Sequence, residues 1–291
     1  MTETSATVIP ATLVKALRDR TGAGIMTCRT TLAETGGDLD AAIERLRDAQ
    51  TTMAAKKADR VALEGLVAIA ASGERGAIVE VNCETDFVAR SVDFRRAVSA
   101  LAPIALATGG HLDVLSAAPS PDGDGRVADL VTRLSARTGE HVAIRRTEVI
   151  AAPGGVVSSY MHNAADPATG TIGVLVALEG PAPALAAIGR QVAMHVAASA
   201  PRWVAAADIP EAVLAEQRVE LQARAQTSGK PAAIVEKMVE GRLRKFVDDV
   251  VLLRQPFIID LDQTVEQALA ADGPVRVRGF VRYRVGDTMT A

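Results

Sequence analysis

The sequence has few of the residues that build disulfide frameworks, zinc sites or large aromatic cores. Its 291 residues include two cysteines, five phenylalanines, two tyrosines and one tryptophan. Cys28 and Cys83 are too far apart in the sequence to indicate a disulfide framework, and there is no CxxC pair for a zinc site. A reducing compartment, the cytoplasm, is therefore expected.

Long apolar runs are also missing, since none approaches the ~20 residues that a membrane-spanning helix needs. The start, MTETSATVIP, has neither the basic region nor the apolar stretch of a secretory signal peptide. The formal net charge of −3 disfavours nucleic acid as a direct partner, because phosphate binding usually needs clustered Lys and Arg. We expect a soluble protein without membrane or nucleic-acid contacts.

Motifs for catalysis and cofactor binding are absent as well. The sequence contains no GxxxxGK[ST] loop, no HExxH and no GxSxG. GAGIMT, at residues 22–27, begins like a dinucleotide fingerprint but lacks the third glycine and a preceding strand, so we interpret it as a turn. We expect no cofactor and no bound metal, and no motif supports an enzyme.

Residues 10–50 have the pattern of three short helices. Pro10 suits a first helical turn, Gly22 ends the first helix, and Asp38 is a good N-cap for the third. A bundle this small buries little area alone, so we expect it to dock on the rest of the chain. A polar stretch follows at 56–62. We interpret its charged residues as parts of a solvated linker: Lys56, Lys57 and Arg60.

From residue 63 the spacing of apolar residues changes from the helical pattern to an alternating one. LEGLVAIAASGERGAIVEVNCE predicts a β-hairpin that turns at ASGERG, and the spacing that follows predicts a helix capped by Ser91. A hairpin and then a helix return at 155–200, where GTIGVLVALEG stands in the place of GAIVEVNCETD. We therefore predict an α+β fold whose core has two pseudo-repeated halves.

Residues 210–250 are charged and have strong helix propensity on both sides of SGKP. They predict a protruding antiparallel helical hairpin, a short coiled coil. The last stretch, GPVRVRGFVRYRVGD, alternates and predicts a strand with one wet face. The expected organisation is a three-helix module at 1–55, a linker at 56–62, a first core half at 63–150, a second core half at 151–209 and 251–291, and the hairpin at 210–250.

The segment VNCETDFVAR, residues 81–90, places an acid beside a large aromatic where a strand ends. From spacing alone, Thr85 or Asp86 would cap a short helical turn and Phe87 would join the core. Cys83 could be a nucleophile only with a base in hydrogen-bond reach, and the sequence shows none. A buried, inert thiol is the simpler interpretation.

Two histidines call for separate interpretations. His195 lies in the apolar helical run AMHVAAS, which favours a buried histidine with a hydrogen-bond partner. His162 lies in the polar loop MHNAADPATG and is the better functional candidate.

Several stretches together identify the sequence as similar to a known family. In order, they occupy most of the chain: LRDRTGAGIMTCRTTLAETGGDLDAAIERLR (17–47), EVNCETDFVAR (80–90), IGVLVALEG (172–180), AMHVAASAP (193–201) and SGKPAAIVEKMVEGRLRKFVDDVVLLRQPFI (228–258). The sequence resembles the elongation factor Ts family, the guanine-nucleotide exchange factors of bacterial elongation factor Tu.

The resemblance implies a fold and a mechanism. The N-terminal module would be ubiquitin-associated-like, and the chain would bind elongation factor Tu in its GDP-bound and nucleotide-free states, displace Mg²⁺ and promote GDP release so that GTP can bind. It would be an exchange factor without covalent chemistry. The residues implied to displace the magnesium ion are Thr85, Asp86, Phe87 and Val88. Further partner contacts are implied for Arg18, Ile25, Met26 and His162.

The sequence departs from the family pattern at several places. Thr138 stands before a Gly-Glu pair where an apolar residue is common, and Thr171 stands where many members have a basic residue. The loop after His162 is longer than in the shortest members, and we expect no C-terminal helix of the kind found in longer members.

Two other classes of function stay open at this stage. An adaptor hypothesis treats the N-terminal bundle as a general peptide-binding module and predicts no acceleration of nucleotide release. An enzyme hypothesis centred on Cys83 predicts loss of activity in Cys83→Ser, whereas the exchange hypothesis predicts little change. Stoichiometry and the role of the helical hairpin do not follow from the sequence.

Overall fold

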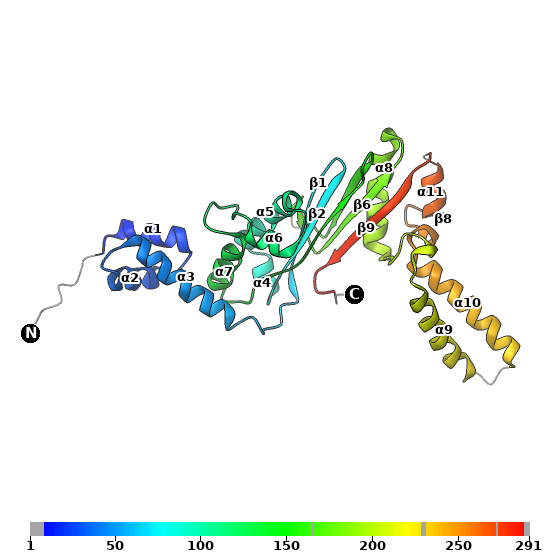
Figure 1. The fold of residues 1–291 in the computed structure, drawn as a ribbon, viewed down its shortest axis with the longest axis horizontal. Coiled ribbons are helices and arrows are strands. Elements are labelled where there is room, and N and C mark those ends of the chain that lie inside the picture. The colour runs from blue at the N-terminus through cyan, green and yellow to red at the C-terminus, as the bar shows by residue number, and fades with distance from the viewer. Residues whose placement is uncertain (1–8, 165, 228–230, 272, 288–291) are drawn as a thin grey trace, which may run out of the picture.

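The computed structural model describes residues 9–164, 166–227, 231–271 and 273–287. Three expectations fall at least partly outside this part of the chain: the absence of a signal peptide at the start, the turn within SGKP, and the absence of a helix at the end. The molecule is elongated, with the N-terminal helices at one end, two sheets in the middle and a pair of long helices at the other end (Figure 1).

Three helices form the N-terminal module: α1 (Ala11–Thr21), α2 (Ile25–Glu34) and α3 (Leu39–Ala55). The predicted boundary signals at Gly22 and Asp38 are confirmed. Gly22 ends α1 at a φ of 68°, where glycine avoids the Cβ penalty, and the Asp38 carboxylate accepts hydrogen bonds of 3.0 Å from two backbone amides of α3. The module has its own small core: Leu17, Cys28, Leu32, Ala42, Ile43 and Leu46.

The first half of the core is a four-stranded sheet in the order β3-β2-β1-β5. The predicted hairpin is confirmed, since β1 (Glu64–Ser72) pairs antiparallel with β2 (Arg75–Cys83). On one face the sheet packs against helices, of which α5 is capped by Ser91 as predicted. The other elements of this half are β3 (Ala143–Ala151), β5 (Thr169–Gly170), α4 (Asp86–Ala89), α5 (Val92–Thr108), α6 (Leu112–Ala117) and α7 (Val127–Thr138).

The second half is a three-stranded sheet in the order β4-β6-β9. The second predicted hairpin is also present, because β4 (Val156–His162) pairs antiparallel with β6 (Ile172–Glu179). Helices α8 (Ala182–Ser199) and α11 (Val265–Ala271) cover its outer face. The inner faces of the two sheets share an apolar layer: Val67, Ile78, Ala152, Val157, Leu175, Ala177, Val281 and Tyr283.

The prediction of one wet face for the last strand, β9 (Arg276–Arg284), is confirmed only in part, because Arg276, Arg278 and Arg284 are exposed but apolar side chains reach both faces. Val281 and Tyr283 are buried in the layer between the sheets, while Val277 and Phe280 pack partly buried on the helical side. The register of β9 shifts opposite Ala177 and Leu178, so that apolar side chains reach both faces. The arginines lie among these residues, and Arg282 is itself only partly exposed.

Helices α9 (Glu211–Gln226) and α10 (Ala232–Val250) lie side by side and project away from the sheets (Figure 1). Backbone hydrogen bonds fix their base, where Arg202 N donates to Val250 O and Leu252 N donates to Trp203 O. Short elements around this base did not follow from the sequence: η1 (Ala206–Asp208), η2 (Leu252–Arg254), β7 (Pro256–Phe257) and β8 (Asp260–Thr264).

The expectation of a fully solvated linker is wrong at Lys57. This side chain is buried, and its Nζ donates a hydrogen bond of 3.2 Å to the carbonyl of Ser135 in α7. An ammonium group is buried only where acceptors replace water, and the partner lies far along the sequence. The module is therefore tied to the core, as expected for so small a bundle. Across the described ranges we find no helix long and apolar enough to cross a membrane.

Candidate functional site

Phe87 lies on the surface, with 83% of its area exposed. It belongs to α4, a single helical turn that follows the end of β2 at Cys83. Val88 packs partly buried against the core and Ala89 is buried, so the turn is anchored on one side and presents Phe87 on the other. The assignment of Phe87 to the core is wrong, because a four-residue helix can bury only one of its sides.

The predicted cap of this turn is confirmed. The Thr85 hydroxyl accepts a long hydrogen bond of 3.5 Å from Val88 N, and Asp86 begins the helix. Asp86 forms an ion pair of 3.0 Å with Arg90 one turn later. Both side chains are substantially exposed, so this pair adds little stability and leaves Asp86 accessible.

Two glutamates hold the start of the turn in place. Glu140, just after the end of α7, accepts hydrogen bonds of 3.0 Å from the backbone amides of Glu84 and Thr85 and one of 2.5 Å from the Thr85 hydroxyl. In return, Glu84 accepts a hydrogen bond of 2.5 Å from His141 N. We call these four residues the Glu140 clasp: Glu84, Thr85, Glu140 and His141. Charge-assisted hydrogen bonds in both directions fix the turn on the sheet.

Electrostatics favour the charged form of Glu84 in the clasp. The backbone hydrogen bond from His141 holds the pKa of the Glu84 carboxyl below its ordinary value, and Arg60, at 3.4 Å, acts in the same direction. The sequence pointed to the turn but not to Glu140, because its partners lie 55 and 56 residues earlier. The one local signal was a glutamate directly after Gly139, which ends α7 at a φ of 77°.

Cys83 does not have the surroundings of a nucleophile. It is buried, its Sγ donates a hydrogen bond of 3.2 Å to the carbonyl of Thr85, and burial raises the pKa of the thiol to about 12. Nucleophilic attack needs the thiolate, which is scarce at neutral pH under these conditions. The predicted burial is confirmed, and the geometry gives the enzyme hypothesis no support. Where the structure describes side chains, we find no group of three or more His, Cys, Asp or Glu placed to hold a metal ion.

The N-terminal candidates lie together on the module. Arg18 is in the last turn of α1, while Ile25 and Met26 are the first two residues of α2. Ile25 is 54% exposed and Met26 is 70% exposed, which is unusual for large apolar side chains in a small bundle. All three line a cleft of about 1210 Å³ between the module and the core. They form a second surface, on different elements from Phe87.

His162 belongs to a third region, at the end of β4. It is exposed, and its Nδ1 lies 3.2 Å from the hydroxyl of Tyr160. It lines a groove of about 670 Å³ with Thr171, Met194 and Ile258. The structure thus places the candidates on three surfaces.

Comparison with known proteins shows the family to which the chain belongs. A family model described as Elongation factor TS matches residues 84–287, starting at the Glu140 clasp. Elongation factor Ts of Rhodospirillum rubrum is 48% identical over 287 residues, covering 96% of this chain and 93% of that protein. The chain belongs to the elongation factor Ts family. The resemblance based on separate stretches is confirmed.

Further members of the elongation factor Ts family match at similar levels. Elongation factor Ts of Maricaulis maris is 48% identical over 289 residues, covering 96% of this chain and 92% of that protein. Elongation factor Ts of Caulobacter vibrioides is 47% identical over 290 residues, covering 96% of this chain and 93% of that protein. These matches extend over the N-terminal module, which lies entirely outside the family-model match. The chain is thus related along almost its whole length to elongation factors of translation.

Proposed function

We propose that this chain is the guanine-nucleotide exchange factor of bacterial elongation factor Tu. Membership of the elongation factor Ts family supports the choice of partner. The observation that carries the mechanism is Phe87, a large aromatic that is 83% exposed on a turn held by the Glu140 clasp. An exposed aromatic side chain gives up the free energy that its burial would contribute to folding. Rigid aromatic side chains commonly anchor protein interfaces.

Exchange needs no covalent step. A factor that binds nucleotide-free elongation factor Tu more tightly than the GDP-bound form must, by linkage, weaken GDP binding by the same ratio. Magnesium in the partner demands near-ideal octahedral geometry, so a small displacement of its surroundings weakens nucleotide binding steeply. Phe87 would enter the partner as a wedge, and Asp86 beside it would disturb hydrogen bonds near the ion. Thr85 and Val88 would hold the wedge in place.

The remaining candidate residues would supply contacts away from the magnesium site. Arg18, Ile25 and Met26 offer an apolar and basic surface on the module. His162 offers a polar tip beside a groove in the second sheet. Both surfaces would bind elongation factor Tu in its GDP-bound and nucleotide-free states, in the cytoplasm, without direct contacts to nucleic acid or membrane.

Stopped-flow release of a fluorescent GDP from elongation factor Tu tests this function. Excess unlabelled GDP traps the emptied partner, and the chain is added at increasing concentration. The proposed function predicts a release rate that rises with the concentration of the chain and saturates. A release rate that stays at the value for elongation factor Tu alone, with a folded chain at saturating concentration, would contradict it and favour the adaptor hypothesis.

A further inference from the structure

The N-terminal module and the core do not share an apolar core. Every residue in the module's buried cluster comes from α1, α2 or α3, and the buried cluster around α5 and α7 begins at Leu66. A shared apolar core is the strongest contact that usually holds two units together. The orientation of this module therefore depends on how α3 lies against α7 and on polar contacts between them.

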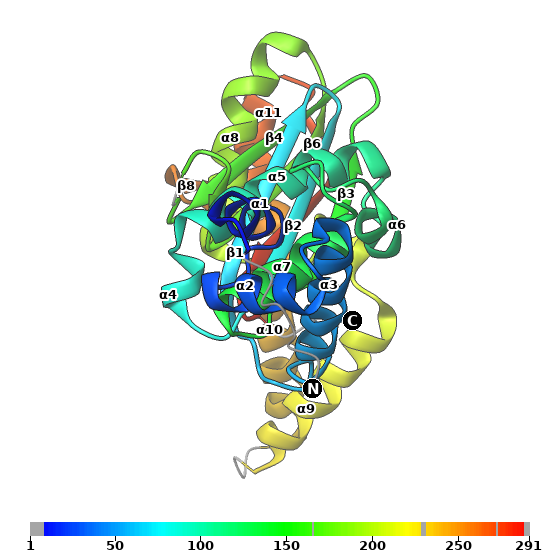
Figure 2. The same ribbon diagram turned by 90° about the vertical axis from the view of Figure 1, so that its left-hand side faces the viewer.

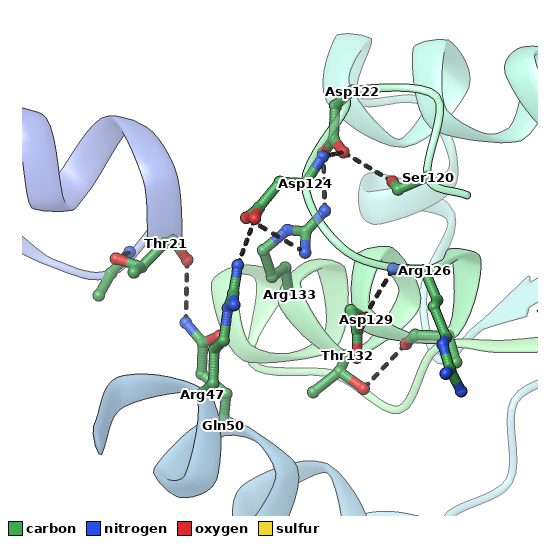
Figure 3. Close-up of polar contacts among 12 residues, drawn as sticks. Thr21, Arg47, Gln50, Ser120, Asp122, Asp124, Arg126, Asp129, Thr132 and Arg133 are labelled. Carbon is green, nitrogen blue, oxygen red and sulfur yellow. Dashed lines mark hydrogen bonds and ion pairs between the residues drawn. The ribbon is translucent and has the colours of Figure 1, made fainter. Parts of the chain in front are cut away.

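Helix α3 packs against α7, and polar contacts join the module to the core across this junction. Arg47 of α3 pairs with Asp124, in the loop before α7 (Figure 3). Lys57, just after α3, donates a hydrogen bond to the carbonyl of Ser135. The end of α1 also lies close to α7, since a Cβ added to Gly22 would lie 3.3 Å from Cδ of Arg137. Of these contacts, the ion pair is the one that joins the middle of α3 to the loop.

The loop is built to hold Asp124 in place. Arg133 of α7 lies beneath it with only 11% of its side chain exposed, 2.7 Å from Asp122 and 3.6 Å from Asp124. Asp122 also accepts hydrogen bonds from the Ser120 hydroxyl, at 2.6 Å, and from Asp124 N, at 3.1 Å. Burial opposes charge on Asp122, but these hydrogen bonds and Arg133 hold the pKa of its carboxyl below the ordinary value. Asp124 thus stands between two arginines from different parts of the chain (Figure 3).

We propose that Arg47, Asp124 and Arg133 form a charged latch that sets the orientation of the N-terminal module for partner binding. The latch lies at the cleft that Arg18, Ile25 and Met26 line from the module side, with Asp124 and Arg133 on the core side. With the module held, its surface and Phe87 meet elongation factor Tu as one pre-arranged unit. The inference rests on the proposed function.

The latch is a positioning device and does not touch the nucleotide. Pre-arranging two surfaces lowers the entropy lost on association. The latch should therefore change the affinity for elongation factor Tu and not the maximal rate of GDP release. Arg47 is 40% exposed and Asp124 is 27% exposed, so salt screens the pair in part. The docked orientation is therefore expected to loosen at high ionic strength while the core stays folded.

The first arm of the test measures the orientation of the module in the free chain. Spin labels on Glu44→Cys in α3 and Asp113→Cys in α6 report the distance between module and core by pulsed electron resonance; both native cysteines are buried. Arg47→Glu is expected to broaden the distance distribution. Arg45→Glu is the matched control, because Arg45 makes the same change of charge on α3 but pairs with Glu34 inside the module. A distribution in Arg47→Glu as narrow as in the control overturns the latch.

The second arm measures GDP release from elongation factor Tu as a function of chain concentration. Arg47→Glu should raise the half-saturating concentration several-fold and leave the maximal rate unchanged, while Arg45→Glu should leave both unchanged. Arg47→Lys, which keeps the positive charge that faces Asp124, should recover most of the affinity. A broad distance distribution with an unaltered half-saturating concentration overturns the role in binding. If the parent chain does not accelerate release, the proposed function fails together with this role, whereas the first arm still decides whether the latch orders the module.

Discussion

At the residue scale, Phe87 and His195 show how position decides the role of a side chain. Phe87 follows the last residue of a buried strand by only four positions, yet it is exposed because Val88 and Ala89 take the inner side of the turn. His195 is fully buried in α8 and packs on Phe257, with 5.8 Å between the ring centroids. Its buried position was correctly predicted from the apolar helix around it.

His195 connects α8 to the base of the helical hairpin. Gln255 Nε2 donates to Asp249 O at 2.6 Å, so its Oε1 is left to accept a hydrogen bond of 2.8 Å from His195 Nε2. His195 Nδ1 then accepts from Ile258 N at 3.4 Å. The neutral imidazole satisfies both contacts, whereas a second ring proton would face the amide of Ile258.

This arrangement predicts that stability falls in mild acid. Burial lowers the folded-state pKa of His195, so below an unfolded value of about 6.5 the unfolded chain binds the extra proton more readily. The free energy of unfolding should decrease as the pH falls through that value, by at most ~1.4 kcal/mol per pH unit from this group. Urea unfolding at several pH values measures it. His195→Asn should flatten the dependence between pH 7 and the folded pKa; an unchanged slope in this variant contradicts the assignment.

At the element scale, the Glu140 clasp joins the end of α7 to the end of β2. It fixes two backbone amides and a hydroxyl that α4, one turn long, could not fix by itself. Short helices are marginal without tertiary contacts, so the position of Phe87 depends on a carboxylate from another helix. The Glu140 clasp thus holds in place the turn that carries the exposed Phe87.

Glu140→Ala should uncouple the position of Phe87 from the core. Hydrogen bonds to a charged group contribute about 1.5–3 kcal/mol, so the variant should be less stable and its Glu84 and Thr85 amides should exchange hydrogen faster. The maximal rate of GDP release should fall even at saturating concentrations. Glu179→Ala, which removes a carboxylate paired with Arg278 on the second sheet, is the control. Normal amide protection of residues 84 and 85 in Glu140→Ala would show that the clasp does not hold the turn.

Local signals were enough to predict most helices and both hairpins. Gly22, Asp38 and Ser91 mark helix boundaries within a few residues, and alternation marks β1 and β2. The features that were missed depend on distant partners. Strand β5 is two residues that pair with β1 about a hundred positions earlier in the chain, as Thr169 opposite Ala68. Lys57, Glu140 and Asp124 were missed as contacts for the same reason, because their partners lie dozens of residues away.

At the scale of the whole molecule, the candidate surfaces lie on three different parts of an elongated chain. The module carries Arg18, Ile25 and Met26, the first sheet carries Phe87, and the second sheet carries His162. The view from the module end shows α4 and α6 on opposite sides of the molecule (Figure 2). A partner that meets the α4 side therefore leaves the α6 side free. A substitution on α6 therefore serves as a control for substitutions at Phe87.

The central claim is that Phe87 acts as the wedge that promotes GDP release. Its most direct test is the maximal rate of GDP release from elongation factor Tu with the Phe87→Ala variant. The wedge role predicts a rate reduced by at least about thirty-fold, because truncating an anchoring aromatic typically costs about 2 kcal/mol or more. Leu112→Ala, which shortens an exposed apolar side chain on α6, should leave the rate unchanged. If folded Phe87→Ala releases GDP as fast as the parent chain at saturation, Phe87 is not the wedge and the central claim is wrong.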